Sequence, residues 1–354
     1  MNLKQKGNLY MKKFNLISFF SGAGGLDTGF HNAGFEVLWA NEFNKQITPT
    51  LRANFPKTTV DDRSLFDVPS NDIPSSAIGI IGAPPCQSWS LGGLGKGLSD
   101  KRGQVFIEYL RVIKDKQPLF FLAENVKGML AKTRKDDLDI LMKEMDALGY
   151  NITYKLLNAR DYGVPEDRWR VIFVGYHKSL GKSFVFPEAT DSTQTLKKAI
   201  WDLRNSAVPA LAKDNPNLEL TISNHEYSTG TFSSQYMSRN RCRLWDEPSF
   251  TIQASGRQAP LHPVSGKMKK ISDDVHIFAD PEKMRRLSVR EVARIQTFPD
   301  DYKFVYNKVD LGYKMIGNAV PVKFAEVLAK TIMKDLVEHF DKKALVEEQA
   351  FTSI

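Results

Sequence analysis

Short apolar runs alternate with segments of helical periodicity along the first half of the chain. A short apolar run bounded by Gly, Pro or Asn is typical of a buried strand. The segments between the runs carry apolar residues at spacings of three and four, which predict helices after residue 26 and over 105–113 and 135–149. This alternation predicts an α/β fold, in which helices cover both faces of a mostly parallel sheet. The predicted strands are 14–20, 37–40, 78–82, 119–123, 152–157 and 171–175.

The pattern changes after the last of these strands. Between residues 178 and 304 the apolar runs are shorter, Pro, Ser and Asn are more frequent, and strand–helix alternation is lost. We therefore predict a sheet domain over 12–177 and a smaller, less regular domain over 178–304. Residues 305–340 are expected to complete the sheet domain with a helix that has Pro321 in its first turn. The predicted end of the chain, 341–354, is a polar tail.

The composition narrows the class of protein. The chain has 354 residues, of which 42% are hydrophobic and 25% charged, as expected for a globular protein with a sizeable core. No apolar run is long enough to span a membrane, and the basic N-terminus does not lead into a secretory signal. Cys86 and Cys242 are the only cysteines, which favours a cytoplasmic location and gives no spacing for a metal. The net charge of +8 is consistent with a polyanionic partner.

A glycine-rich turn, residues 20–27, follows the first predicted strand. Such a turn lets backbone N–H groups approach an anionic ligand at a helix N-terminus. A dinucleotide fingerprint requires a third glycine where Asp27 stands, which disfavours a nicotinamide dehydrogenase and suits a cofactor with an amino-acid end. Glu42 follows the second strand, where a carboxylate can accept hydrogen bonds from ribose hydroxyls. Asp62, or alternatively Asp61, is placed to bind an adenine amino group, so the set indicates a nucleoside cofactor such as S-adenosylmethionine.

A second set of polar residues is predicted at the same edge of the sheet. Two prolines fix the backbone directly before the thiol in Gly82-Ala83-Pro84-Pro85-Cys86-Gln87. Glu124 follows another predicted strand, and Arg168 and Arg170 come before the last one. A thiolate, a carboxyl group and a guanidinium are the groups needed for conjugate addition to a pyrimidine. Taken singly, Cys86 could be an ordinary buried residue and Glu124 a helix N-cap.

These motifs together resemble those of the DNA cytosine-5 methyltransferases, in family order from about residue 14 to 325. The narrower resemblance is to GGCC-recognising enzymes of bacterial restriction–modification systems, the HaeIII type, with Glu166 replacing the usual Gln before the arginine pair. The family motifs are residues 82–87, 124–126, 168–170, 286–299 and 317–321, and those of the narrower group are 224–227, 237–241 and 254–258.

The resemblance implies a Rossmann-like S-adenosylmethionine-dependent fold, a target-recognition domain and a role for each site residue. Cys86 would add to C6 of a cytosine flipped out of duplex DNA, while Glu124 holds N3 and the amino group and Arg170 contacts O2, with Arg168 beside it. The implied cofactor residues are Phe20, Gly22, Gly24, Gly25, Leu26, Glu42, Asp62, Pro84, Asn318 and Val320. The implied DNA-binding residues are Ser88, Arg239, Arg241, Arg257 and Gln258.

Two segments are predicted to act on the DNA. Residues 88–103 include five glycines between 92 and 103, and we interpret them as a lid that closes over the flipped base. The segment 239–270 contains seven Lys or Arg residues and two acidic residues. We expect Trp245 and Phe250 to hold the arginines of this segment in place. Arginine is the common bidentate reader of guanine. A phosphate-contacting or solvated face is the alternative.

Three readings of the function follow. The preferred one is a DNA cytosine-5 methyltransferase that acts as a monomer on double-stranded DNA, uses no metal, and protects host DNA from a restriction endonuclease. A tRNA cytosine methyltransferase shares the Cys86 and Glu124 motifs. A silent nucleic-acid-binding regulator on the same scaffold is disfavoured by the presence of Cys86, Glu124 and Arg170.

Overall fold

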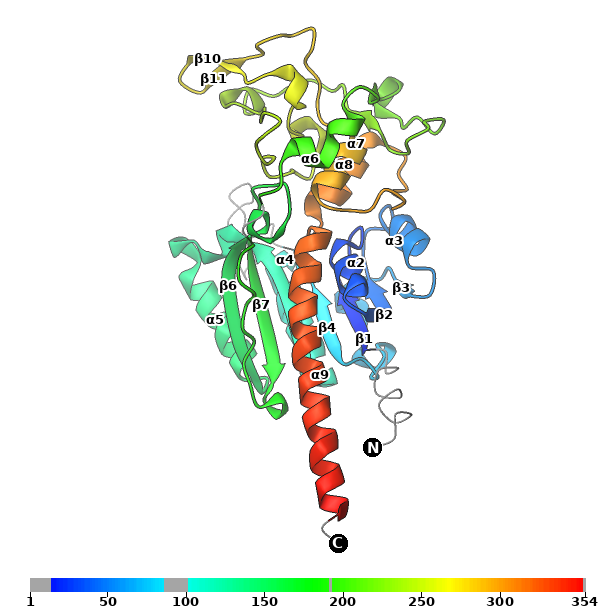
Figure 1. Ribbon diagram of the computed structural model, residues 1–354, viewed down its shortest axis with the longest axis vertical. Helices are drawn as coiled ribbons and strands as arrows, with labels where there is room; N and C mark the ends of the chain where they lie inside the picture. The colour runs from blue at the N-terminus through cyan, green and yellow to red at the C-terminus, as the bar shows by residue number, and fades with distance from the viewer. Residues whose placement is uncertain (1–13, 86–100, 191–192, 353–354) are drawn as a thin grey trace.

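The computed structural model describes residues 14–85, 101–190 and 193–352 (Figure 1). Cys86, Ser88 and residues 88–100 of the predicted lid lie outside the described residues. The described chain forms a sheet with flanking helices and, over one edge of the sheet, a second lobe. We use "second lobe" for residues 193–318. In Figure 1 the last described residues of the chain, drawn in red, lie at the opposite end of the molecule from this lobe.

The main sheet has seven strands in the order β3-β2-β1-β4-β5-β7-β6. All its neighbouring pairs are parallel except the two that include β7, which is antiparallel to both β5 and β6. The predicted mostly parallel α/β sheet is therefore confirmed, with one reversed strand. The strands are β1 (Phe14–Phe19), β2 (Phe35–Asn41), β3 (Thr59–Asp61), β4 (Gly79–Gly82), β5 (Phe120–Val126), β6 (Tyr150–Asn158) and β7 (Trp169–His177).

Helices cover both faces of this sheet because alternate strand residues point to opposite sides. Phe120 faces a core formed with α2 (Gly25–Asn32) and α9 (Val322–Thr352). Phe121, the next residue, faces a core formed with α4 (Lys101–Lys116) and α5 (Lys135–Asp146). The remaining helix beside the sheet is α3 (Thr48–Asn54).

Three details differ from the sequence prediction. β5 continues to Val126, so Glu124 lies inside the strand, because β7 pairs with β5 as far as Val126. The predicted helix with Pro321 in its first turn is α9, whose first residue follows Pro321, and a further helix, α8 (Val309–Asn318), precedes it. α9 then continues through most of the segment predicted as a polar tail.

The second lobe contains short elements on two cores, one large and one small. One core joins α6 (Leu196–Ile200), α7 (Val289–Ile295) and α8, and also includes Ala23 and Ile47 from the sheet side. The other surrounds Cys242 and lies near the hairpin of β10 (Lys269–Ser272) and β11 (Val275–Ile277). A further parallel pair is β8 (Val208–Pro209) with β9 (Glu226–Tyr227). Among the helices that the structure describes, none has the length and apolarity of a membrane span.

Candidate active site

The candidate site residues collect at the edge of the sheet that faces the second lobe (Figure 1). The chain reverses its strand order between β1 and β4, and ligands of open α/β sheets bind at the carboxyl ends of strands near such a point. The glycine-rich turn follows β1, Glu42 follows β2 and Pro84 follows β4. Because β7 is reversed, its first residues lie at this same edge.

The glycine-rich turn has no room for side chains at two positions. Gly24 has a φ of +80°, and a Cβ there would lie 2.6 Å from a ring carbon of Phe55 and 2.6 Å from the hydroxyl oxygen of Tyr302. A Cβ on Gly25 would lie 2.3 Å from the carbonyl oxygen of Val320. The N-terminus of α2 therefore rests directly on the turn between α8 and α9, and this brings Val320 to the glycine-rich turn as the family motifs imply.

Glu42 ties the glycine-rich turn to the end of β2. One carboxylate oxygen accepts a hydrogen bond from the Gly22 N–H at 2.9 Å, and the other accepts one from the Asn44 N–H at 2.7 Å. Burial raises the pKa of Glu42, and these two backbone donors oppose the rise. The carboxylate is thus fixed at the edge where a ribose would lie.

The two aspartates at the end of β3 are not equivalent: Asp61 is the last residue of the strand and Asp62 directly follows it. Asp61 accepts hydrogen bonds from the Arg63 guanidinium at 2.6–3.1 Å, and this arginine lowers the pKa of Asp61. Asp62 has a single longer ion pair with Arg52 at 3.4 Å, and about a third of its side chain is exposed. Asp62 therefore has more unused hydrogen-bond acceptor capacity than Asp61, which favours Asp62 as the residue that binds the adenine amino group.

Phe43 is a residue that the sequence interpretation missed. It directly follows Glu42, and its side chain is 67% exposed although it is a large aromatic. An exposed ring beside the carboxylate predicted to bind ribose offers a flat face for an adenine to stack on. The sequence signal that could have identified Phe43 is an aromatic residue immediately after the acidic residue that follows a strand.

Glu124 and Arg170 form the most direct pairing of predicted catalytic residues. The Arg170 Nε atom lies 2.7 Å from a Glu124 carboxylate oxygen, with side-chain exposures of only 13% and 8%. Asn125, the next residue, donates a hydrogen bond from its amide to the Pro84 carbonyl at 3.4 Å. The end of β5 therefore binds both the guanidinium and the proline turn that precedes Cys86.

Arg168 does not lie where the prediction placed it. Its side chain is fully buried, and it donates hydrogen bonds to the carbonyls of Gly317 at 2.8 Å and Ala319 at 2.9 Å. It also donates to the carbonyl of Ile252 at 3.3 Å and pairs with Glu166 at 3.4 Å. Since every contact goes to the protein interior, we interpret Arg168 as a positioning residue that holds three chain segments together.

The three predicted DNA-binding arginines occupy two different environments. Arg241 donates hydrogen bonds to the carbonyls of Tyr236 and Gln235 and stacks on the Tyr236 ring at 4.9 Å. Arg243 is the cation over Phe250, at 4.2 Å, so the expected anchoring of Arg241 by Trp245 and Phe250 is wrong.

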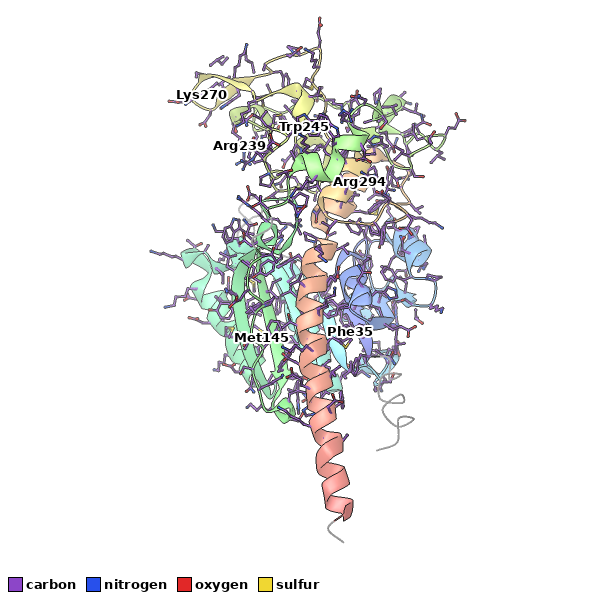
Figure 2. All side chains as sticks on the ribbon, in the orientation of Figure 1. Phe35, Met145, Arg239, Trp245, Lys270 and Arg294 are labelled. Atoms are coloured by element: carbon purple, nitrogen blue, oxygen red, sulfur yellow. The ribbon has the colours of Figure 1, made fainter. Side chains whose placement is uncertain are left out.

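Arg239 and Arg257 are exposed, and within the described chain neither guanidinium has a hydrogen-bond or ion-pair partner. In Figure 2 Arg239 lies on the side of the second lobe that carries Lys270. Gln258, beside Arg257, is partly exposed.

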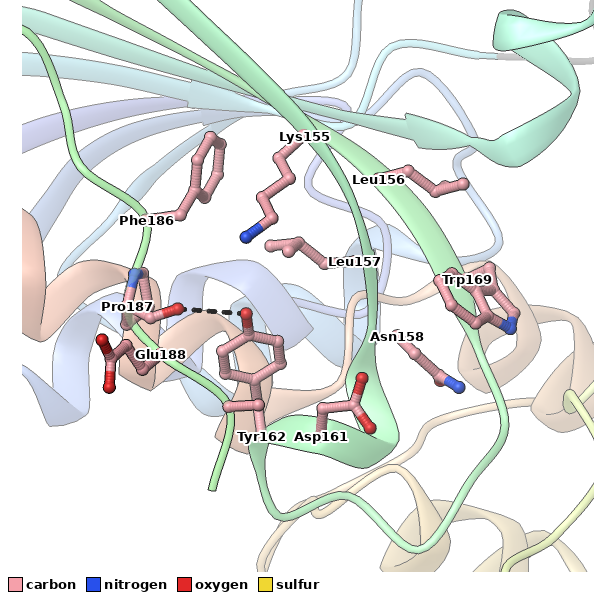
Figure 3. Close-up of a pocket in the computed structure, with 11 residues that line it drawn as sticks. Lys155, Leu156, Leu157, Asn158, Asp161, Tyr162, Trp169, Phe186, Pro187 and Glu188 are labelled. Atoms are coloured by element: carbon pink, nitrogen blue, oxygen red, sulfur yellow. Dashed lines mark hydrogen bonds between the residues drawn. The ribbon is translucent and has the colours of Figure 1, made fainter. Parts of the chain in front are cut away.

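A separate pocket of about 320 Å³ lies at the outer strand β6 (Figure 3). Tyr162 donates a hydrogen bond to the Pro187 carbonyl at 3.1 Å across it, and Lys155 and Trp169 also line it. Its lining residues include none of the predicted site residues, so we do not assign the reaction to it. No cluster of His, Cys, Asp and Glu suitable for a metal ion occurs in the part of the chain that the structure describes.

The strand order and the glycine-rich turn define a Rossmann-like fold of the S-adenosylmethionine-dependent methyltransferases. A prophage-encoded E. coli protein described as a DNA modification methyltransferase shares this fold, with a TM-score of 0.71 at 24% identity, over 92% of this chain and 99% of that one. Residues 14–334 match the model of the C-5 cytosine-specific DNA methylases. The chain therefore belongs to that family and is a DNA cytosine-5-methyltransferase.

The chain is similar to two Type II methyltransferases. M.MthTI of Methanothermobacter thermautotrophicus is 51% identical over 325 residues, which cover 91% of this chain and 98% of the relative. M.NgoPII of Neisseria gonorrhoeae is 49% identical over 327 residues, which cover 91% of this chain and 96% of the relative. The family resemblance is thus confirmed, and S-adenosylmethionine is the cofactor that the family uses. The GGCC specificity and the individual residue roles remain predictions.

Proposed function

We propose that this chain methylates C5 of a cytosine flipped out of duplex DNA, within GGCC, through a covalent bond between Cys86 and C6. The observation that carries this proposal is the Glu124–Arg170 pair at 2.7 Å. It lies at the edge of the sheet where the described chain reaches Pro85, the residue bonded to Cys86. A carboxyl group and a guanidinium at this edge can hold the cytosine ring while a thiolate adds to it.

Each side chain has one task in the proposed reaction. The Cys86 thiolate forms a bond to C6, and electron density moves to C5, which then takes the methyl group. Glu124 holds the N3 and amino edge of the ring and Arg170 holds O2, so charge that develops on the ring is stabilised. Loss of the C5 proton restores the double bond and expels Cys86 as a thiolate.

The glycine-rich turn fits the proposed cofactor. S-adenosylmethionine supplies an electrophilic methyl group when bound. Glu42 would accept hydrogen bonds from its ribose hydroxyls, Phe43 and Asp62 would hold its adenine, and backbone groups of the turn would face its amino-acid end. The turn is open at Gly22, where an added Cβ would meet only the carbonyl oxygen of Phe20, at 4.0 Å. The other proposed cofactor residues are Phe20, Gly22, Leu26, Pro84, Asn318 and Val320.

The site specificity is assigned to the second lobe. Gly256, next to Arg257, donates its N–H to Asp310 at 2.7 Å, and a Cβ there would lie 2.8 Å from Tyr313. Arg257 is therefore an exposed guanidinium on a firmly held turn, as bidentate reading of guanine requires. We propose Arg257 and Arg239 as base readers, with Gln258 and Ser88 contributing contacts. We propose that Arg241 supports them by fixing the Tyr236 turn.

The family match and the Type II relatives favour DNA over tRNA as substrate. The names of these Type II relatives also support a role alongside a restriction endonuclease. Methylation of the site would block DNA cleavage by that endonuclease. A catalytically silent nucleic-acid-binding regulator is disfavoured, because the structure contains the ion pair between Glu124 and Arg170.

Bisulfite sequencing of DNA from a methylation-free host that expresses the chain tests the proposal. We expect one cytosine of each GGCC site to be protected on both strands, and a restriction enzyme that cuts GGCC to fail on this DNA. Protection confined to another sequence would overturn the GGCC assignment. Protection of tRNA without protection of DNA would overturn the substrate assignment.

Replacing Arg257 with Ala is expected to weaken binding to GGCC duplexes by about 1–3 kcal/mol. Binding to a scrambled duplex should change far less, since a base reader adds little to non-specific affinity. Lys269→Ala is the matched control, because Lys269 is an exposed cation on the β10–β11 hairpin. It should weaken both duplexes alike and flatten the salt dependence by about one unit. Equal losses on both duplexes for Arg257→Ala would make it a phosphate contact.

A further inference from the structure

A large aromatic residue beside the proposed base-binding pair has no task in the reaction described above. Trp169 is the first residue of β7 and is 44% exposed, although it lies between the buried Arg168 and Arg170 in the sequence. The Arg170 guanidinium donates a hydrogen bond to the Trp169 carbonyl at 2.9 Å, and its Nε atom pairs with Glu124. Trp169 is therefore fixed to the arginine that we propose holds the cytosine.

A lysine lies over the Trp169 ring. The Nζ atom of Lys127 is 5.6 Å from the ring centroid, a distance at which a cation is attracted to the face of an indole. Lys127 begins a short helix directly after β5, three residues beyond Glu124. Lys127 is exposed, and among the residues that the structure describes its ammonium group has no carboxylate partner. The ring thus positions a free cation beside the pair of Glu124 and Arg170.

The segment that contains Lys127 is basic. Residues 125–135 include four Lys or Arg residues and no acid. Lys132 and Lys135 are exposed like Lys127, whereas Arg134 pairs with Asp137. This segment leaves β5 at the edge of the sheet that faces the second lobe. In Figure 1, α5, which follows the segment, and the β10–β11 hairpin of the second lobe lie on the same side of the molecule. Both lobes therefore present cations on this side.

We propose that Lys127, held by Trp169, binds a backbone phosphate of the DNA strand that carries the target cytosine, next to the flipped nucleotide. This inference rests on the proposed binding of the cytosine by Glu124 and Arg170. A flipped base stays bonded to its own strand, so a cytosine held at this pair brings the neighbouring phosphates of that strand to the same edge. An ammonium group is a compact charge suited to a phosphate, and such a contact positions the strand without reading its sequence.

The salt dependence of binding distinguishes this contact from the others in the protein. Replacing Lys127 with Ala should flatten the slope of log affinity against log salt by about 0.9 on a GGCC duplex, the contribution of one phosphate. The affinity loss should then be about threefold larger at about 50 mM than at about 200 mM salt. On a scrambled duplex the change should be smaller, because no nucleotide is flipped into the site. An unchanged slope on the GGCC duplex would overturn the inference.

Neutral methylphosphonates locate the contacted phosphate. A hemimethylated GGCC duplex fixes which strand carries the target, and S-adenosylhomocysteine in place of the donor prevents methyl transfer. Replacing the contacted phosphate should weaken binding by the unaltered chain and leave binding by Lys127→Ala unchanged, because the two changes remove the same interaction. We expect this coupling at a phosphate next to the target cytosine. Coupling on the complementary strand alone, or at no position, would overturn the assignment.

Two variants of Trp169 test whether the ring positions Lys127. Trp169→Leu removes the aromatic face and should reproduce most of the change in salt slope. Trp169→Phe keeps an aromatic face and should restore most of the original slope. Lys127→Ala should have little further effect when it is added to Trp169→Leu. Fully additive effects of these two substitutions would overturn the positioning role of Trp169.

The second lobe supplies a matched control. Lys197 lies over the ring of Trp201 at 5.5 Å, and Trp201 is 41% exposed, but this pair does not adjoin Glu124 and Arg170. Lys197→Ala should leave the salt slope on the GGCC duplex unchanged. Equal flattening by both lysine variants would indicate a general effect of charge and overturn the inference. Failure of the unaltered chain to bind duplex DNA would instead overturn the proposed function.

Discussion

Replacing Cys86 with Ala is expected to abolish methyl transfer while duplex binding largely survives. The other thiol, Cys242, cannot substitute, because it is fully buried in the second lobe and burial raises its pKa to about 12. Binding should persist because we assign site reading to Arg239 and Arg257, away from the thiol. Transfer of a labelled methyl group to GGCC duplexes, measured beside a binding assay, checks both halves of the prediction.

A duplex with 5-fluorocytosine at the target tests the same step without a variant. Fluorine does not leave C5 as a proton does, so the bond between Cys86 and C6 should persist after methyl transfer. Mass spectrometry of the digested complex should locate the link at Cys86. A link at any other residue, or measurable turnover by Cys86→Ala, would contradict the covalent mechanism.

Replacing Arg168 with Ala is expected to destabilise the protein by about 3–5 kcal/mol, the usual cost of breaking a buried ion pair. The variant loses hydrogen bonds to the carbonyls of Gly317, Ala319 and Ile252 and leaves Glu166 buried without its cation. These bonds join β7 to the second lobe and to the turn between α8 and α9. Urea unfolding followed by circular dichroism measures the loss.

Arg160→Ala is the matched control for that experiment. Arg160 also pairs with a carboxylate, Asp167 at 3.4 Å, but its side chain is 42% exposed. Exposed pairs of this kind contribute about 0–1 kcal/mol. If Arg168→Ala unfolds at the same urea concentration as Arg160→Ala, Arg168 does not hold these segments together. If Arg168→Ala is stable but loses transfer, the original catalytic assignment is the better one.

Most of the sheet could be predicted from the sequence because its signals are local. A central parallel strand is buried on both faces, so each one reads as a continuous apolar run ending in Gly, Pro or an acid. The glycine-rich turn and Glu42 were found for the same reason, since each directly follows a strand. The reversal of β7 was not predictable in this way, because a buried strand has the same apolar pattern in either direction.

The side-chain partners were decided by the tertiary structure. Arg168 and Arg170 are two residues apart and identical in type, yet one is buried among backbone carbonyls and the other pairs with Glu124. Arg241 and Arg257 look equivalent in a basic stretch, but only Arg257 keeps its guanidinium free.

The sequence by itself thus determined the fold class and which residue types meet at the edge of the sheet. The tertiary structure decided which of those residues face a ligand and which face the interior. The physical reason is that Arg168 binds the carbonyls of residues 252, 317 and 319, which lie far from it along the chain. Packing brings these carbonyls to Arg168, and contacts between residues so distant in sequence cannot be predicted from a local sequence pattern.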